Sequence, residues 1–387
     1  MRTKNVVFMI AVLLAFIAQG AIWYTMPLIF AQTFGNDYFE VGLLIALIPL
    51  MEVIAAIPFG YFADIGKIKT ITFDSMLALL LTPFLFTINI NIFTAMGTFL
   101  FAAGGVGIWI ATNAYVANVF GRREIKYIGY ELALMGMGWV TGPMLGGLIY
   151  DGFGKIALAV TEMLVIAIAS FLFLRTLEVE TPVRNSRAPK FMKILKIQNR
   201  VIHRLPAFVF PFLLLSFIFS YLELSVWVAV PLITVITSSS VLLGGFMIGI
   251  INIPSMVGEA LGGKLYRRGE EKKIVSLALV LAALSMVASA IFLNQSFYAL
   301  VILLATALFT AFAYVGIFSA VIERDTRDTG EISALATVTG GFGGALAAVI
   351  AGATVATYKL QVVAGVFCVL VFLYLLYLRF AFKDSEF

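Results

Sequence analysis

Long apolar stretches separated by short polar segments run along almost the whole chain. Several of them stay apolar over about 20 residues or more, as 6–30 does, which is the length an α-helix needs to cross a bilayer. Strands of a membrane barrel would instead alternate apolar and polar residues over about ten positions. Because lipid cannot hydrogen-bond to peptide groups, the pattern predicts spanning helices.

The polar breaks divide the chain into twelve predicted spans. They cover 6–30, 41–63, 70–88, 93–119, 127–150, 156–175, 207–234, 241–264, 273–293, 297–321, 332–353 and 359–380. The only long hydrophilic segment, 176–206, follows the sixth span. We therefore expect an all-α membrane protein with an N-terminal six-helix bundle (1–175), a basic linker (176–206) and a C-terminal six-helix bundle (207–387).

Composition and charge agree with a membrane protein. Hydrophobic residues make up 62% of the chain and charged residues 12%, whereas soluble domains average about 45–50% and 25%. With the N-terminus placed in the cytoplasm, 24 of the 26 Lys and Arg residues fall on cytoplasmic segments, and only Lys155 and Lys359 do not. This bias predicts a multi-pass protein of the cytoplasmic membrane with both termini inside. It also accounts for the positive net charge, so no nucleic-acid partner is expected.

The two halves of the chain resemble each other. Trp23 and Pro27 of the first span recur with the same spacing as Trp227 and Pro231 of the seventh, each Pro followed by Leu-Ile. At a similar offset, Gly138 and Gly142 fall on Gly340 and Gly344. Six helices repeated in one orientation predict two pseudo-symmetric bundles with a solute path between them.

Residues for enzyme chemistry are scarce. The chain has one histidine and one cysteine, and no G-x-x-x-x-G-K-[ST] loop for nucleotide phosphates. A metal site or a thiol–imidazole nucleophile is therefore not expected. We predict a non-enzyme with no cofactor and no metal.

The loop after the second span carries Gly60, Asp64, Gly66, Lys67 and Lys69. This segment resembles the G-x-x-x-D-x-x-G-[RK]-[RK] signature of the major facilitator superfamily, with one residue fewer between the aspartate and the second glycine. Glycine allows helices to approach closely, and an aspartate can cap a helix or pair with an arginine.

The fifth span contains a second motif, with fixed residues Gly138, Gly142, Pro143, Gly146 and Gly147. It is similar to the G-x-x-x-G-P-x-x-G-G motif of twelve-helix drug–proton antiporters in that superfamily. Glycines four apart make a flat stripe for another helix, and the proline bends the span. One departure is that the fourth span has no arginine around Gly104, so a coupling mechanism using that arginine is not implied.

The resemblance implies a central cavity lined mainly by the first, fourth, seventh and tenth spans. An ionisable group at membrane depth costs about 2.5–3.5 kcal/mol on insertion scales, so each one calls for an explanation. Glu223 is the first candidate for binding a proton or a cationic substrate, and Gln19 is its uncharged counterpart in the repeat. Glu52 is the second candidate. The other expected lining residues are aromatic or polar: Trp23, Trp227, Trp109, Asn113 and Tyr314.

The resemblance also implies a cytoplasmic gate. Gly60 and Asp64 would form it with Arg122 and Arg123, and Glu131 would pair with these arginines or with Asp64. Each buried carboxyl could alternatively be a packing residue that is hydrogen-bonded between helices.

The predicted function is transport of a small solute by alternating access, with proton-coupled efflux of a drug-like or amphipathic compound as the first hypothesis. Its partners would be the small-molecule substrate, protons and the lipid bilayer, and the protein would be a monomer. A proton-coupled importer or facilitator of a metabolite is the alternative within transport. A non-transporting receptor or scaffold on the same fold is the alternative class.

The topology can be tested with one cysteine. In a Cys368→Ser background, Ser186→Cys should resist an impermeant thiol reagent added to intact cells and react after the membrane is opened, because the linker faces the cytoplasm. Labelling from outside would overturn the predicted orientation.

Overall fold

The computed structural model describes residues 3–35, 37–64, 66–120, 124–177, 209–236, 239–265, 271–291, 303–315, 317, 329–355 and 360–380. Most of the predicted linker, and Arg122 and Arg123 of the predicted gate, lie outside these ranges. The side chain of Asp64 is likewise outside the described part.

The described chain is helical. Its long helices are α1 (Thr3–Thr33), α2 (Tyr38–Asp64), α3 (Ile68–Thr87), α4 (Asn91–Phe120), α5 (Glu124–Thr176), α7 (Phe210–Ile236), α8 (Val241–Leu265), α9 (Glu271–Ile291), α11 (Thr329–Val355) and α12 (Leu360–Phe380). Among the described residues, ten helices are long and apolar enough to cross a membrane, and Leu303–Val315 is a shorter apolar helix. Every predicted span overlaps one of these helices, so the all-α membrane fold is confirmed.

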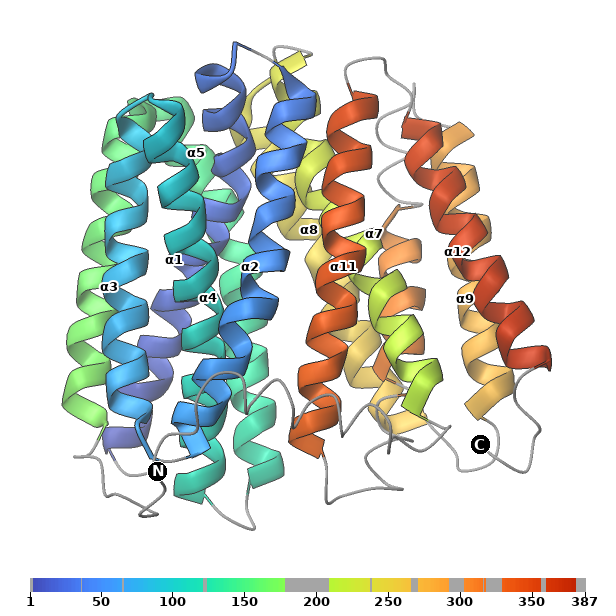
Figure 1. Ribbon diagram of the computed structural model, residues 1–387, viewed down its shortest axis with the longest axis horizontal. Helices are drawn as coiled ribbons and strands as arrows, with labels where there is room; N and C mark the ends of the chain where they lie inside the picture. The colour runs from blue at the N-terminus through green and yellow to red at the C-terminus, as the bar shows by residue number, and fades with distance from the viewer. Residues whose placement is uncertain are drawn as a thin grey trace. The chain divides into compact units, whose positions relative to one another are not determined.

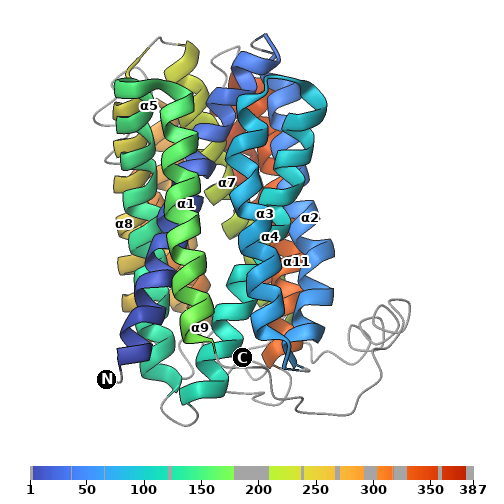
Figure 2. The same ribbon diagram turned by 90° about the vertical axis from the view of Figure 1, so that its left-hand side faces the viewer.

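Two predicted spans fall within α5. Its 53 residues would measure about 80 Å as one straight helix, far more than the hydrocarbon core of about 30 Å. Helical geometry breaks at Gly154, with φ 81° and ψ 176°, a conformation that glycine adopts at little cost. In Figure 2 the two segments of α5 are joined at one end and run back alongside each other. The break therefore separates α5 into the spans predicted at 127–150 and 156–175.

The described residues form two compact units. Unit 1 lies within Met1–Leu195 and also includes Val230–Gly249, whereas unit 2 lies within Lys196–Ala229 and Ile250–Phe387. The end of α7 and the start of α8 thus pack with helices of the N-terminal half. The predicted domain boundaries at 176–206 stay a prediction.

In unit 1, α1 packs closely against α5, and α3 packs against α4 (Figure 1). The contact between α1 and α5 depends on glycine. A Cβ atom at Gly138 would lie 2.6 Å from the Cβ of Phe16, and one at Gly142 would overlap the carbonyl oxygen of Ile17. Gly146 faces Ala21. Gly138, Gly142 and Gly146 of the fifth-span motif therefore form the surface on which α1 packs.

Unit 2 contains an equivalent contact between α7 and α11. A Cβ atom at Gly340 would lie 2.7 Å from the Oγ of Ser220, and one at Gly343 would overlap the carbonyl oxygen of Phe217. The Tyr221 hydroxyl also donates a hydrogen bond to the carbonyl of Val363 in α12, at 3.3 Å. Each unit therefore packs its first helix against a glycine-rich fifth one, in agreement with the repeat in the sequence.

Gly60 is different from these packing glycines. No described atom lies within 4 Å of the position that its Cβ would occupy. In this conformation Gly60 does not bring two helices together, unlike the expectation from the signature loop.

These two glycine environments give a matched pair of variants. Gly142→Ala should lower the free energy of unfolding by about 1–3 kcal/mol, because the added methyl group meets α1 backbone. Gly60→Ala should leave stability unchanged or raise it, because its methyl group meets no described atom and alanine favours the helix. Thermal melting of both purified proteins in one detergent measures the difference, and equal melting temperatures would contradict the tight α1–α5 contact.

Candidate substrate-binding site

Aromatic side chains connect α1 and α4 at two levels within unit 1. Trp23 meets Phe101 edge-on, with ring centroids 5.6 Å apart, and Phe16 meets Trp109 edge-on at 6.4 Å. The residue numbers rise along α1 as they fall along α4, so the helices are antiparallel here. Edge-to-face rings hold the two helices in a defined register.

Gln19 lies between these two aromatic levels. It is 3% exposed, and its Oε1 is 3.2 Å from the position that a Cβ atom of Gly105 would occupy. Its Nε2 has no hydrogen-bond partner among the described residues. A buried donor without a partner costs about 1–3 kcal/mol, so Gln19 is suited to donate to a bound molecule or water.

Trp109 and Asn113 extend this surface along α4. Trp109 is 42% exposed although it lies well inside a spanning helix. The Asn113 side-chain amide donates to the carbonyl oxygen of Trp109 at 2.9 Å. Gln19 and Trp23 of α1 lie against α4, on which Trp109 and Asn113 are one helical turn apart. These four residues are here called the α1–α4 site.

The other predicted lining residues lie in unit 2 or on α2. Tyr314 stacks on Phe219, with centroids 4.7 Å apart and planes at 19°. Trp227 is buried in α7, and Glu52 is half-buried in α2.

Glu223 does not have the desolvated environment expected for it. The side chain is exposed, whereas Tyr221, Leu222, Leu224 and Ser225 around it are buried. Helical periodicity explains the difference, because it places Glu223 on the one open face of this part of α7. An ionised carboxylate facing lipid is costly, so an exposed glutamate within a span is expected to face water.

The predicted gate is only partly within the described residues. Glu131 is fully buried in α5 and lies near Thr112 of α4. Its expected partners Arg122 and Arg123, and the side chain of Asp64, lie outside the described part. Pairing within the gate stays a prediction.

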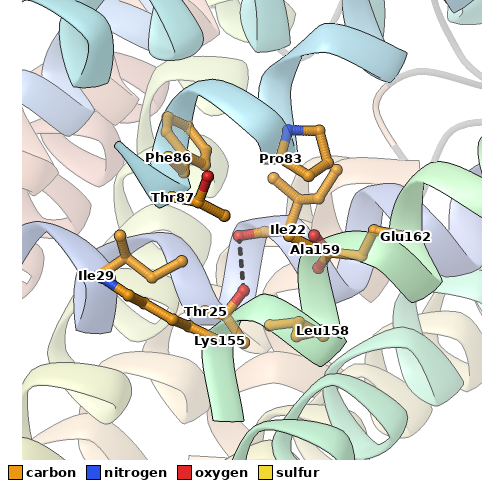
Figure 3. A pocket seen from close by; sticks show the side chains of 10 residues that line it. All are labelled: Ile22, Thr25, Ile29, Pro83, Phe86, Thr87, Lys155, Leu158, Ala159 and Glu162. Atoms are coloured by element: carbon orange, nitrogen blue, oxygen red, sulfur yellow. Dashed lines mark hydrogen bonds between the residues drawn. The ribbon is translucent and has the colours of Figure 1, made fainter. Parts of the chain in front are cut away.

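A small crevice between α1, α3 and α5 is seen in Figure 3. The side chain of Glu162 is 6% exposed and lies in the crevice, where its Oε1 has no hydrogen-bond partner among the described residues. Lys155 reaches the opposite end and donates to the Oδ1 of Asn89 at 2.7 Å. The space fits about one water molecule, so the crevice is too small for a solute.

Asp151 is a polar residue that the sequence analysis did not single out. Its carboxylate accepts hydrogen bonds from the Ser240 hydroxyl at 2.6 Å and from the N–H groups of Val241 and Leu242 at 3.2 and 2.9 Å. A sequence signal existed, because Asp151 follows Gly147 by one helical turn and so extends the glycine motif. Its partner, a serine at the start of a later span, could not be identified without the tertiary structure.

The family model of the Major Facilitator Superfamily matches residues 8–348. The chain belongs to this superfamily. The match includes residues of every long helix described above except α12 and confirms the resemblance to this superfamily. The resemblance to drug–proton antiporters stays a prediction.

Two curated relatives match parts of the chain. Over 90 residues it is 36% identical to the riboflavin transporter RibZ of Clostridioides difficile (strain 630), covering 23% of this chain and 18% of that one. Over 131 residues it is 28% identical to the uncharacterized MFS-type transporter MJ1560 of Methanocaldococcus jannaschii, covering 33% of each. The matches therefore span a third or less of these relatives.

A solved structure shows the same fold. A crystal structure of a mutant of the nucleoside transporter NupG superposes with a TM-score of 0.79, covering 98% of this chain and all of the other. The sequence identity is 13%, so this likeness supports the fold alone. The family match and this shared fold agree on a membrane protein of the Major Facilitator Superfamily.

The α1–α4 site gives a test that separates binding from stability. Gln19→Met should leave the melting temperature unchanged or raise it, because it removes a buried donor that has no partner in the described part of the chain. It should weaken solute binding about tenfold, the value of one hydrogen bond.

Ser75→Ala is the matched control. Ser75 of α3 also has a buried side-chain oxygen without a described partner, but it does not belong to the α1–α4 site. Solute binding is measured in the same way for both variants. Unchanged binding in Gln19→Met would show that the Gln19 amide does not touch the solute.

Proposed function

We propose that this chain is a secondary transporter that carries a small aromatic or amphipathic solute across the cell membrane by alternating access. The observation that carries the proposal is Gln19, a buried amide between two aromatic levels whose Nε2 has no hydrogen-bond partner among the described residues. A planar ring could lie against Trp109 while its polar edge bonds to Gln19 or Asn113. The names of two similar proteins, a riboflavin transporter and a nucleoside transporter, point to solutes of this shape.

The direction and coupling ion are the finer part of the proposal. The fifth-span motif resembles that of drug–proton antiporters and favours proton-coupled efflux. Glu223 would bind the proton, or a cationic solute in its place, at an open face of α7. Its counterpart in the repeat is Gln19, so the fold accepts an uncharged side chain at this position. Import of a metabolite is the alternative. The flux assay described next distinguishes import from efflux.

The test is flux in proteoliposomes with and without an imposed pH gradient. Riboflavin, a nucleoside and a lipophilic cation are suitable first solutes. Glu223→Gln should abolish solute accumulation driven by the pH gradient but keep exchange between equal solute pools. Accumulation requires proton binding at Glu223, whereas exchange of solute for solute does not. Glu40→Gln is the control, the same chemical change at the exposed start of α2.

Three outcomes would contradict parts of this proposal. Accumulation by Glu223→Gln at the wild-type rate would exclude Glu223 as the coupling residue, and Glu52 would be tested next. Flux that is independent of pH would exclude proton coupling. Saturable binding without any flux would favour the receptor alternative.

A further inference from the structure

A second contact of α5, on a different face from the α1 contact, joins it to α8 within unit 1. A Cβ atom at Gly249 would lie 2.6 Å from the carbonyl oxygen of Val140, and one at Gly147 would lie 3.0 Å from the Cα of Leu242. A Cβ atom at Gly245 would overlap the carbonyl oxygen of Pro143. We call this contact the α5–α8 seam. Its backbones approach closely because glycines lie along both helices.

Asp151 closes the seam at the start of α8. The first N–H groups of a helix have no partner within the helix and carry a partial positive charge. Asp151 accepts two of them, from Val241 and Leu242, and also accepts the Ser240 hydroxyl proton. Ser240 meanwhile accepts the N–H of Leu243 at 3.4 Å. The start of α8 is therefore capped jointly by its own serine and by an aspartate of α5.

The start of α2, the counterpart of α8 in the repeat, is capped differently. Asp37 precedes α2 directly, and its Oδ1 accepts the N–H groups of Phe39 and Glu40 at 3.1 and 3.2 Å. That cap is local and persists wherever α2 moves. The cap of α8 instead depends on a residue 89 positions away in sequence, so it exists only while α5 and α8 are together.

Tyr24 adds a tie from α1. Its hydroxyl donates to the carbonyl oxygen of Val241, so the N–H and the carbonyl group of Val241 both have partners outside α8. The bonds of Asp151 lie at an exposed position. Water can replace exposed hydrogen bonds at modest net cost, which makes this contact reversible.

We propose that Asp151 is a gating residue: its carboxylate holds the start of α8 against α5, and transport requires that contact to break and re-form. The inference rests on the alternating access proposed above, because a cap shared between α5 and α8 can act as a gate only if these two helices separate during transport. Three bonds to one ionised carboxylate are charge-assisted, so the negative charge itself contributes to closure. The predicted topology puts this contact at the extracellular end of the helices.

The first test measures opening of the seam without any solute. Ile248 of α8 is fully buried and adjoins Gly249, so Ile248→Cys, in a Cys368→Ser background, reacts with a soluble maleimide only when the seam opens. Adding Asp151→Ala should speed labelling about tenfold to a hundredfold, the value of charge-assisted hydrogen bonds. Asp151→Asn, which keeps the shape but loses the charge, should give a smaller increase and serves if the alanine variant does not fold. Ile92→Cys, at 65% exposure at the start of α4, is the control and should label at one rate throughout.

The second test asks whether transport needs the contact to break. Asp151→Cys with Ser240→Cys places two thiols where a 2.6 Å hydrogen bond was. Joining them with a short bifunctional thiol reagent should stop the flux that remains in the untreated double variant. The same treatment should leave each single variant at its own untreated flux, whatever that level is.

The outcomes separate this inference from the proposed function. If Ile248→Cys is labelled at the same rate whether position 151 is Asp, Asn or Ala, the gating role is overturned. Undiminished flux in the cross-linked protein also overturns it. If no solute moves in any variant but the labelling rates rise as expected, the transport proposal fails and the capping contact stands.

Discussion

The close approach of the α1 and α5 backbones is the contact on which the rest of unit 1 depends. Gly138 and Gly142 leave no room for a side chain between the two helices. Apolar side chains gain little by leaving lipid for another helix, so helices in a membrane associate mainly through close packing. The contact fixes the position of α1, and α1 in turn carries Gln19 and Trp23 to α4.

The same helix serves two contacts through two of its faces. One face of α5, at Gly138 and Gly142, packs on α1, and another, from Val140 to Asp151, packs on α8. The first contact is mainly buried backbone packing, with one hydrogen bond at its exposed end, from the Gln32 amide of α1 to the Tyr150 hydroxyl of α5. The second ends in three hydrogen bonds to one exposed carboxylate. This difference suits the first to a permanent role within unit 1 and the second to the reversible role proposed for it.

The two halves of the repeat share their helix packing but differ in the polar residues at equivalent positions. Both units pack their first helix on a glycine-rich helix, yet Gln19 of α1 is buried and its counterpart Glu223 of α7 is exposed. Likewise α2 has a local aspartate as its cap, whereas α8 shares one with α5. Duplication explains what the halves have in common. The proposed binding, coupling and gating residues lie where the halves differ.

Sequence by itself determined the helical spans and the family. The bilayer imposes on each span a length and an apolar composition, and both are visible in a continuous stretch of sequence. The sequence also located the glycines of α5, since their spacing is a local property of one helix. It could not determine which face of α7 stays open at Glu223, or that the amide of Gln19 is left without a described partner. Nor could it pair Asp151 with Ser240. Burial and partnership depend on which helices become neighbours, and only the tertiary structure decided that.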